Sequence, residues 1–366
     1  MPFCFFGAFD PFYPRIAILR RGLELNRNYA GDIHLPLRLK AWVRYPVGLL
    51  SVVVRRNCLG RKDVHLLVPA FGHKDIPLAY SVARCYSRHL VFDPLASRYE
   101  TKIIDWQRRR PGALAAGWNR LLDRLTLRLA DFVLADTACH KNYYSQEFGV
   151  NPAKIGVVPV GFDDSLWKPA APSPEKRKVF TVVFFGSFLP LHGVETMVEA
   201  ALILKSVTPP VRFVFIGSGQ TLPRVRGLLE KKGDANIIWQ SWLSSHALVR
   251  TVNQIADLCM GLFGQSPKAY RVVPHKIFQA MALGKAVLTL DTPAVREFFR
   301  HQQEIYLCPE AKPEAIAEAI LELRQNADLR QAIAKRGQGL VWEKYNPAAI
   351  GKTFLTRVAE FFSPRG

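Results

Sequence analysis

The sequence predicts an α/β protein with two doubly wound, parallel-sheet domains, and three observations lead to this prediction. The chain has 366 residues, which is too long for one ordinary hydrophobic core. Apolar residues make up 49% of it, which is ample for two cores. Short apolar runs alternate with helical stretches, a pattern typical of βαβ units whose sheet is covered on both faces.

The C-terminal half shows this alternation most clearly. Most of its apolar runs are followed by a loop and then by a helical stretch, such as 194–205 after the first run. The runs expected to form strands are 179–186, 211–220, 236–240, 256–263 and 286–291. Three further helical stretches are expected at 313–326, 328–345 and 347–362.

The N-terminal half repeats the pattern less regularly. Its expected strands are 3–7, 63–72, 89–94, 130–137 and 154–163. The segment 171–178, rich in proline and charge, is the best candidate for a linker. We therefore expect an N-terminal domain over 1–168, a C-terminal domain over 179–346 and a last helix in 347–366. Because ligands bind outside the carboxyl ends of the strands in such sheets, we expect a cleft between the domains.

Composition narrows the range of partners and compartments. Six cysteines are scattered without a C-x-x-C pair, which argues against a zinc site and suits a reducing cytoplasm. No apolar run reaches the length of a membrane span, and the first residues lack the features of a signal peptide.

The net charge of +20 is divided evenly along the chain. Residues 1–165 carry 24 basic and 14 acidic residues, and residues 166–366 carry 26 and 16, so each part is +10. Anionic lipid and phosphorylated small molecules both suit this charge. No zinc-finger or RNP-type motif supports a nucleic-acid partner. A generally basic, solvated surface is the alternative.

A basic helix start marks the clearest candidate site. The stretch RVVPHKIFQAMALGKAV, residues 271–287, is typical of a helix with Pro274 at its first position, followed by a buried strand. Arg271 and Lys276 lie at its N-terminus, and Lys268 precedes them. The helix dipole is already positive there, so collected cations indicate an anionic ligand. The alternative is that these charges face solvent.

Two loops with glycines follow expected strands and can also cradle a phosphate. The first runs from Gly186 to Gly193 and offers His192 as an additional donor. The second contains Gly217 and Gly219. Each loop alone is equally compatible with tight packing. Together with the basic helix start, they favour a ligand that carries phosphate.

These segments together resemble a known family. VVFFGSFLPLHGVETMVEAALIL, FVFIGSGQ and PHKIFQAMALGKAVLTLDTPAVREFF resemble the C-terminal domain of family 4 glycosyltransferases, which have the GT-B fold. Residues 130–169 are similar to the segment that closes the first domain in that family. The resemblance implies a retaining enzyme that takes a sugar from a nucleotide-diphosphate sugar and requires no metal or other cofactor. It also implies that the helix at 347–362 crosses back onto the N-terminal domain.

The resemblance assigns donor-binding roles to particular residues, and this chain departs from the family pattern at several of them. Ser187 and His192 stand where the family has an Arg and a Lys that contact the diphosphate. The family's E-x7-E pair falls on Arg271 and Gln279. The Gln279 amide can still accept a hydrogen bond from ribose, whereas Arg271 can accept none. The predicted donor site consists of Gly186, Ser187, His192, Gly193, Gly217, Gly219, Lys268, Arg271, Lys276 and Gln279.

Candidate acceptor-binding and catalytic residues follow the N-terminal strands. Gly7 permits close approach of a substrate, and Asp10 and Arg15 are expected to bind its polar groups. Asp93 stands where the family often has a His near the reacting sugar. Asp93 and His73 are the candidate catalytic residues, which orient the acceptor hydroxyl or support developing charge. The alternatives are a turn cap for Asp93 and an ordinary loop position for His73.

Two basic, apolar segments bear on the acceptor and on location. Residues 35–62 and 105–132 combine Leu, Val and Trp with clustered Arg, as surfaces that lie on anionic membranes do. The alternative is amphipathic helices packed on the N-terminal sheet. We therefore expect a cytoplasmic glycosyltransferase, peripheral on the inner face of the plasma membrane, that acts on a glycan or lipid-linked acceptor in cell-envelope polysaccharide synthesis. A nucleotide-sugar epimerase, a phosphorylase or a catalytically silent nucleotide-binding protein are the alternatives.

Overall fold

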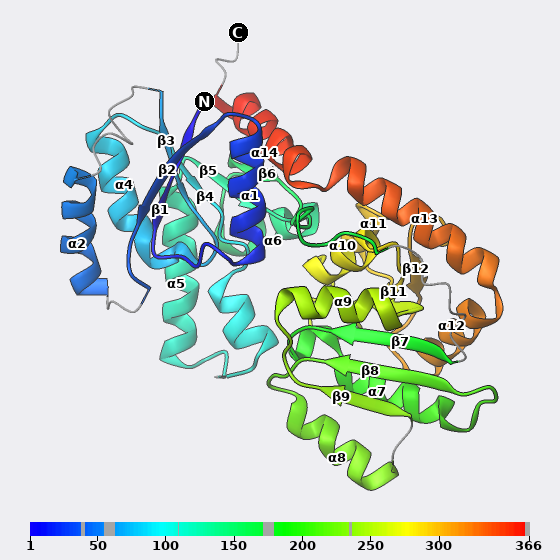
Figure 1. The fold of residues 1–366 in the computed structure, drawn as a ribbon. Coiled ribbons are helices and arrows are strands. Elements are labelled where there is room, and N and C mark those ends of the chain that lie inside the picture. The colour runs from blue at the N-terminus through cyan, green and yellow to red at the C-terminus, as the bar shows by residue number, and fades with distance from the viewer. Residues whose placement is uncertain (38–40, 55–62, 109, 171–178, 234–235, 363–366) are drawn as a thin grey trace. The chain divides into compact units, whose positions relative to one another are not determined.

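The computed structural model describes residues 1–366 except 38–40, 55–62, 109, 171–178, 234–235 and 363–366 (Figure 1). The chain forms two compact units. The first contains residues 1–161 together with 345–366, and the second contains residues 162–344. The predicted linker 171–178, Cys58 and part of the basic segment 35–62 lie outside the described residues.

A parallel six-stranded sheet forms the centre of the first unit, with the strand order β2-β1-β3-β4-β5-β6. Its strands are buried apolar runs, except for the edge strand β2. The strands are β1 (Phe3–Gly7), β2 (Tyr29–His34), β3 (His65–Val68), β4 (Leu90–Phe92), β5 (Phe132–Ala135) and β6 (Ile155–Val157).

Helices cover both faces of this sheet. One face packs against α2 (Ala41–Val54), α4 (Ile76–Cys85), α5 (Leu114–Leu129) and α6 (Ala138–Phe148). The other face packs against α1 (Pro14–Leu25) and α14 (Pro347–Phe362). Three short helices complete the unit: η1 (Gly72–Asp75), η2 (Glu100–Asp105) and η3 (Pro152–Lys154).

Helix α14 lies directly against α1, so the last helix belongs to the first unit. Glycines allow this contact, because a Cβ on Gly351 would overlap the backbone of Gly22. The side-chain amide of Asn26 donates a hydrogen bond to the Ala348 carbonyl at 3.0 Å. The buried side chains of Phe354 and its neighbours on α14 complete the core on this face of the sheet.

The second unit contains another parallel six-stranded sheet, in the order β12-β11-β10-β7-β8-β9. Its central strands are continuous apolar runs, as expected for a sheet buried on both faces. The strands are β7 (Phe180–Phe185), β8 (Val211–Ile216), β9 (Ile237–Gln240), β10 (Leu258–Met260), β11 (Ala286–Leu290) and β12 (Tyr306–Cys308).

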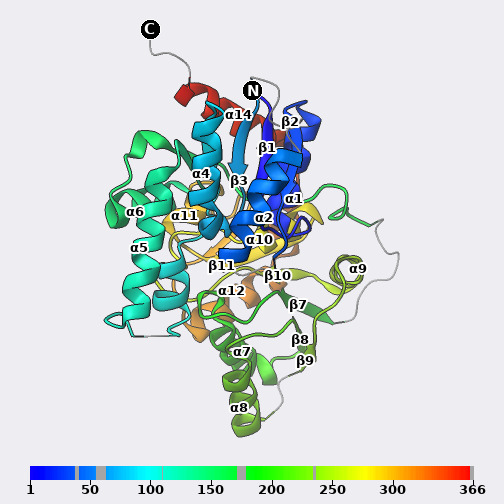
Figure 2. The ribbon, with the colours of Figure 1, turned by 90° about the vertical axis from the view of Figure 1, so that its left-hand side faces the viewer.

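Helices α7 and α12 pack against one face of this sheet. Helix α8 lies beside α7, as Figures 1 and 2 both show. The helices of the unit are α7 (Val194–Ile203), α8 (Leu222–Lys232), α9 (Ser245–Ile255), α10 (His275–Ala282), α11 (Pro293–Arg296), α12 (Pro313–Gln325) and α13 (Ala327–Lys344), with short helices η4 (Pro190–His192) and η5 (Leu204–Ser206).

The structure confirms the predicted fold class of two doubly wound parallel sheets with the last helix packed on the first unit. Every strand predicted from an apolar run is present; β1 has the predicted bounds and the others are shorter than predicted. Two strands, β2 and β12, were not predicted. Helix α10 begins at His275 rather than at Pro274, which is instead its extended N-cap residue.

Candidate functional site

Lys276, in the first turn of α10, has the most unusual environment among the predicted donor residues. It is only 6% exposed, and its Nζ has no hydrogen-bond partner within the described part of the chain. The ammonium lies 3.9 Å from the centre of the Phe184 ring. Burial holds the pKa of Lys276 well below its usual value. A buried cation without a counter-charge is costly, so this position favours an anion.

The Gly186–Gly193 loop lies beside this lysine. It follows β7, and Gly186 has a φ of +132°, a conformation that side chains rarely adopt. A Cβ at Gly186 would lie 3.0 Å from Nζ of Lys276. The backbone of the loop can therefore approach a ligand at the lysine without a side chain between them.

His192 lies at the end of this loop, in a neutral form. Its Nδ1 lies 2.5 Å from the carbonyl oxygen of Ser187, which identifies Nδ1 as the donor. Burial, followed by the charge of Lys276, holds the pKa of His192 well below its usual value. His192 therefore supplies no positive charge here.

The second glycine loop is held against the first. The backbone N–H of Phe188 donates to the Ser218 carbonyl at 2.9 Å, and Gly217 lies against the Gly186 carbonyl. Gly219 contacts the backbone of Phe188. The two loops that the sequence predicts as phosphate cradles thus form one surface, at the carboxyl ends of β7 and β8.

The remaining predicted donor residues surround α10. The backbone N–H of Arg271 donates to the Lys268 carbonyl at 3.0 Å, so the two residues share a turn before the helix. Lys268 is 8% exposed, and its charge also lowers the pKa of His192. Gln279 follows Lys276 by three residues and therefore lies on the same helix face.

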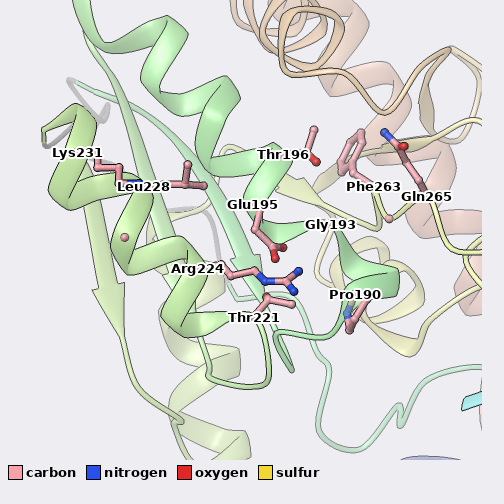
Figure 3. A pocket seen from close by; sticks show the side chains of 12 residues that line it. Pro190, Gly193, Glu195, Thr196, Thr221, Arg224, Leu228, Lys231, Phe263 and Gln265 are labelled. Atoms are coloured by element: carbon pink, nitrogen blue, oxygen red, sulfur yellow. The ribbon is translucent and has the colours of Figure 1, made fainter. Parts of the chain in front are cut away.

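A cavity of about 640 Å³ opens beside Gly193, between α7 and α8 (Figure 3). Its lining includes polar residues that the sequence analysis did not single out, among them Thr221, Arg224 and Glu195. Thr221 is 2% exposed and its hydroxyl has no partner in the described structure. Figure 3 shows Glu195 and Arg224 directed toward the same part of the cavity. Of the predicted donor residues, Gly193 lines this cavity.

In the first unit, the predicted residues Arg15 and Asp93 bind each other. Arg15 Nε donates to Asp93 Oδ2 at 2.7 Å, and the residues are 1% and 2% exposed. Arg15 also donates from Nη1 to the carbonyls of Val158 and Pro159, at 3.0 and 2.6 Å. The pair therefore connects α1, the end of β4 and the segment after β6, and neither side chain is presented to a ligand in this structure.

His73 is buried as well, in η1. Its Nε2 lies 3.3 Å from Asp123 Oδ1, and both residues are almost fully buried. Burial, followed by the charge of Arg98, lowers the pKa of His73 to about 3. Burial raises the pKa of Asp123 to about 6. The His73 ring is thus a neutral group within the unit.

Gly7 and Asp10 lie at the carboxyl end of β1. Gly7 contacts the side chain of Asp75, which accepts a 3.0 Å hydrogen bond from the N–H of Ala8. Asp10 is exposed, and its Oδ1 accepts the N–H of Phe12 at 2.9 Å. Among the described residues no group of His, Cys, Asp and Glu is arranged to hold a metal ion.

Residues 165–340 match the family described as Glycosyl transferases group 1. This segment covers most of the second unit, including both glycine loops and α10.

Curated relatives match part of the chain at low identity. The chain is 20% identical over 234 residues to an uncharacterized glycosyltransferase of Methanocaldococcus jannaschii. It is 22% identical over 170 residues to alpha-D-kanosaminyltransferase of Streptomyces kanamyceticus. These matches cover 63% and 46% of this chain, and 58% and 43% of the relatives' lengths.

Solved structures match almost the whole chain. HepE of Anabaena, in complex with UDP, has a TM-score of 0.69 at 16% identity and covers 98% of this chain and 100% of its own. Sucrose-phosphate synthase of Thermosynechococcus elongatus has a TM-score of 0.70 at 13% identity, with 99% of both chains covered. Both units together therefore have the GT-B fold.

Proposed function

We propose that this protein is a retaining glycosyltransferase that uses a nucleotide-diphosphate sugar as donor. The observation that carries the proposal is the buried, unpartnered ammonium of Lys276 between a glycine loop and a helix start. Two relatives matched over part of their length are glycosyltransferases by name, and HepE was crystallised with UDP and with UDP-glucose. A diphosphate would supply the anion that Lys276 lacks.

Lys276 also accounts for the departures of this chain from the family pattern. The loop carries Ser187 and His192 in place of cations, and His192 is neutral. One ammonium from α10 therefore takes over the charge that the loop does not provide. In the reaction it would stabilise the diphosphate as negative charge develops on the leaving group. We assign Gln279, one turn further along α10, the role of accepting a hydrogen bond from the ribose.

The first unit is assigned to the acceptor, a glycan or lipid-linked molecule of cell-envelope polysaccharide synthesis. Because Asp93 and His73 are buried and bound within the unit, we assign them the positioning of the loops after β4 and β3. Proton removal from the acceptor hydroxyl then falls to the departing diphosphate. No metal or other cofactor is required in this proposal.

We further propose that the enzyme works on the cytoplasmic face of the plasma membrane. Leu114, Trp118, Leu121 and Leu125 are 96%, 60%, 46% and 49% exposed, and their spacing places them on one face of α5. Arg120 and Arg124 lie on the same helix. An apolar face beside arginines suits an anionic bilayer surface. No helix in the described part of the chain combines the length and apolarity that a membrane span requires.

UDP binding to Lys276→Ala and to Lys335→Ala tests the donor site. Lys335 is an exposed lysine of α13 and controls for the loss of one positive charge. We expect Lys276→Ala to weaken the affinity for UDP by at least about tenfold, because charge-assisted hydrogen bonds contribute about 1.5–3 kcal/mol. Lys335→Ala is expected to bind like the unmodified protein. Equal affinity in all three would refute the donor site.

A second measurement separates the proposed function from its alternatives. A transferase releases nucleoside diphosphate from a panel of sugar nucleotides only when an acceptor is present. An epimerase interconverts sugar nucleotides without acceptor. A silent binding protein binds them and does neither.

A further inference from the structure

A second cavity, in the first unit, lies at the carboxyl ends of β1 and β3. Its volume is about 290 Å³. Basic residues and aromatic residues both line it. Its lining includes Tyr13, Arg44, Phe71, Lys74, Asp75 and Arg98.

One of the three basic lining residues is already neutralised. Nη1 of Arg44 lies 3.0 Å from Oδ1 of Asp75, and the other Asp75 oxygen accepts the N–H of Ala8. Asp10, the other acidic lining residue, is exposed to solvent. Among the described residues, no carboxylate lies within ion-pair distance of Lys74 or Arg98. The Nε atom of Arg98 is buried without a hydrogen-bond partner there.

Further positive charge lies next to Arg98. Lys102, in η2, is partly buried, and this burial lowers its pKa. The charges of Arg98, Lys74 and Arg108 lower it further, and the opposing charge of Asp123 does not compensate. Mutual repulsion among these cations is unfavourable in the free protein, and a bound anion would relieve it.

The backbone of Arg98 is firmly held. The N–H groups of Arg98 and Tyr99 donate to Asp123 at 3.1 and 2.8 Å, and the Ser97 hydroxyl donates at 2.7 Å. Asp123 itself is fully buried. An arginine with an anchored backbone is better preorganised to bind a phosphate than one on a free surface.

Tyr13 and Phe71 form an aromatic part of the cavity wall. Tyr13 and Phe71 contact edge to face, with ring centres 5.1 Å apart. Phe71 has a φ of +66°, which is rare for a non-glycine residue and typical of strained positions at binding sites. Its ring is 51% exposed. Such a wall suits the ring of a sugar or another apolar group next to the anion.

We propose that this cavity binds the acceptor through a phosphate group held by Arg98 and Lys74. The proposal rests on the proposed function, since it names the chemical class of the acceptor. The phosphate can belong to a soluble sugar phosphate or to a lipid headgroup. In both cases the aromatic wall contacts the part of the acceptor next to the phosphate.

The test measures ligand binding to protein saturated with UDP, so that phosphate does not occupy the donor site. Inorganic phosphate, glucose 6-phosphate and glucose are titrated in turn. We expect both phosphates to bind and glucose to bind at least tenfold more weakly than glucose 6-phosphate. Arg98→Gln is expected to lose at least tenfold in affinity for both phosphates, and Arg98→Lys less.

Lys141→Gln is the charge control, a partly buried lysine of α6 that does not line the cavity. It is expected to bind like the unmodified protein. Lys74→Gln, at an exposed position, provides a second variant if Arg98→Gln does not fold. The proposal is overturned if neither variant changes phosphate affinity, or if glucose binds as well as its phosphate.

Two vesicle samples identify the source of the phosphate. Phosphatidylcholine vesicles are prepared with and without a polyprenyl phosphate. Recruitment that depends on both the lipid phosphate and Arg98 supports a lipid-linked acceptor, and tight binding of glucose 6-phosphate alone supports a soluble one. If UDP binding depends on Lys276 while phosphate binding ignores Arg98, only the present inference fails. If UDP does not bind, the phosphate titration is carried out without UDP. Phosphate binding in that titration would mean that only the proposed donor site fails.

Discussion

Lys276 combines two properties that conflict in the free protein: it is buried, and its amine has no hydrogen-bond partner among the described residues. Such a residue lowers the stability of the protein that carries it, because an ammonium loses its hydration on burial. Function at the expense of stability is common in binding sites. The conflict leads to a prediction that a purely structural lysine would not satisfy.

Lys276→Met should make the nucleotide-free protein more stable and should weaken its binding of UDP. We expect the free energy of unfolding to rise by about 1–3 kcal/mol, since a side chain of similar length replaces an unpaired buried cation. Urea denaturation without nucleotide, followed by UDP titration, measures both effects. A variant that loses stability would show that the ammonium has a partner in the folded protein.

His140 supplies a pH-dependent contribution to the stability of the first unit. Burial opposes its charged form, but Asp136 at 2.6 Å and Glu100 at 3.3 Å outweigh burial and raise the pKa of His140 to about 9. A raised pKa stabilises the folded state below the unfolded value of about 6.5. That contribution is lost as the pH rises through about 9.

We therefore expect the stability difference between the unmodified protein and His140→Gln to shrink as the pH rises from 6.5 to 9.5. Its full size should be at most about 3 kcal/mol. Urea midpoints across this range measure it. His246→Gln, at an exposed histidine of α9, is the control variant. A constant difference for His140→Gln would contradict the charged assignment.

At the scale of single residues, the sequence identified candidate site residues. It did not identify the side chains that these residues contact in the fold. The basic start of α10 was visible because cations are unusual at a helix N-terminus. The partner of Arg15 was not visible, since Asp93 lies 78 residues further along the chain. Thr221 and Arg224 were not singled out, because a Thr before a helix normally caps it. In this structure the Thr221 side chain makes no capping hydrogen bond.

At the scale of elements, continuous apolar runs predicted every interior strand of the two described sheets and two of the four edge strands. Buried parallel strands need apolar residues on both faces, so ten of the twelve strands were recognisable. Strand β2, with the sequence YAGDIH, has one buried residue, Ile33. Strand β12 contains only three residues. Both lie at sheet edges, where fewer neighbours constrain the sequence.

The contact between α1 and α14 depends on two glycines, which leads to a third prediction. Gly351→Ala should destabilise the protein by about 1–3 kcal/mol, because the added Cβ overlaps the Gly22 backbone. Gly339→Ala on α13 is the matched control, since a Cβ there meets nothing within 4 Å. That change should stabilise by about 0.5–1 kcal/mol through helix propensity. Thermal melting of both variants measures these effects. Equal melting temperatures for the two variants would contradict the close packing of α1 and α14.

At the scale of the whole molecule, the +20 charge and the exposed face of α5 act together in the proposed membrane binding. Trp118→Ser combined with Leu121→Ser should reduce binding to anionic vesicles by about tenfold, because exposed apolar area is lost. Ile203→Ser, at a 47% exposed apolar residue of α7, is the control. Co-sedimentation should also weaken as salt rises. Binding that ignores both the variants and the salt would exclude this surface.

The order of the chain has a consequence for synthesis. Residues 162–344 form the second unit as one uninterrupted insertion, after which α14 returns to the first. The side chains of Phe3, Ile16 and Leu19 pack on the α14 side of the first sheet. At 5–20 residues per second, translation beyond residue 161 takes roughly 10–40 s before α14 is available. During that interval the nascent first unit presents an uncovered apolar surface, and it is then most open to chaperones and to aggregation.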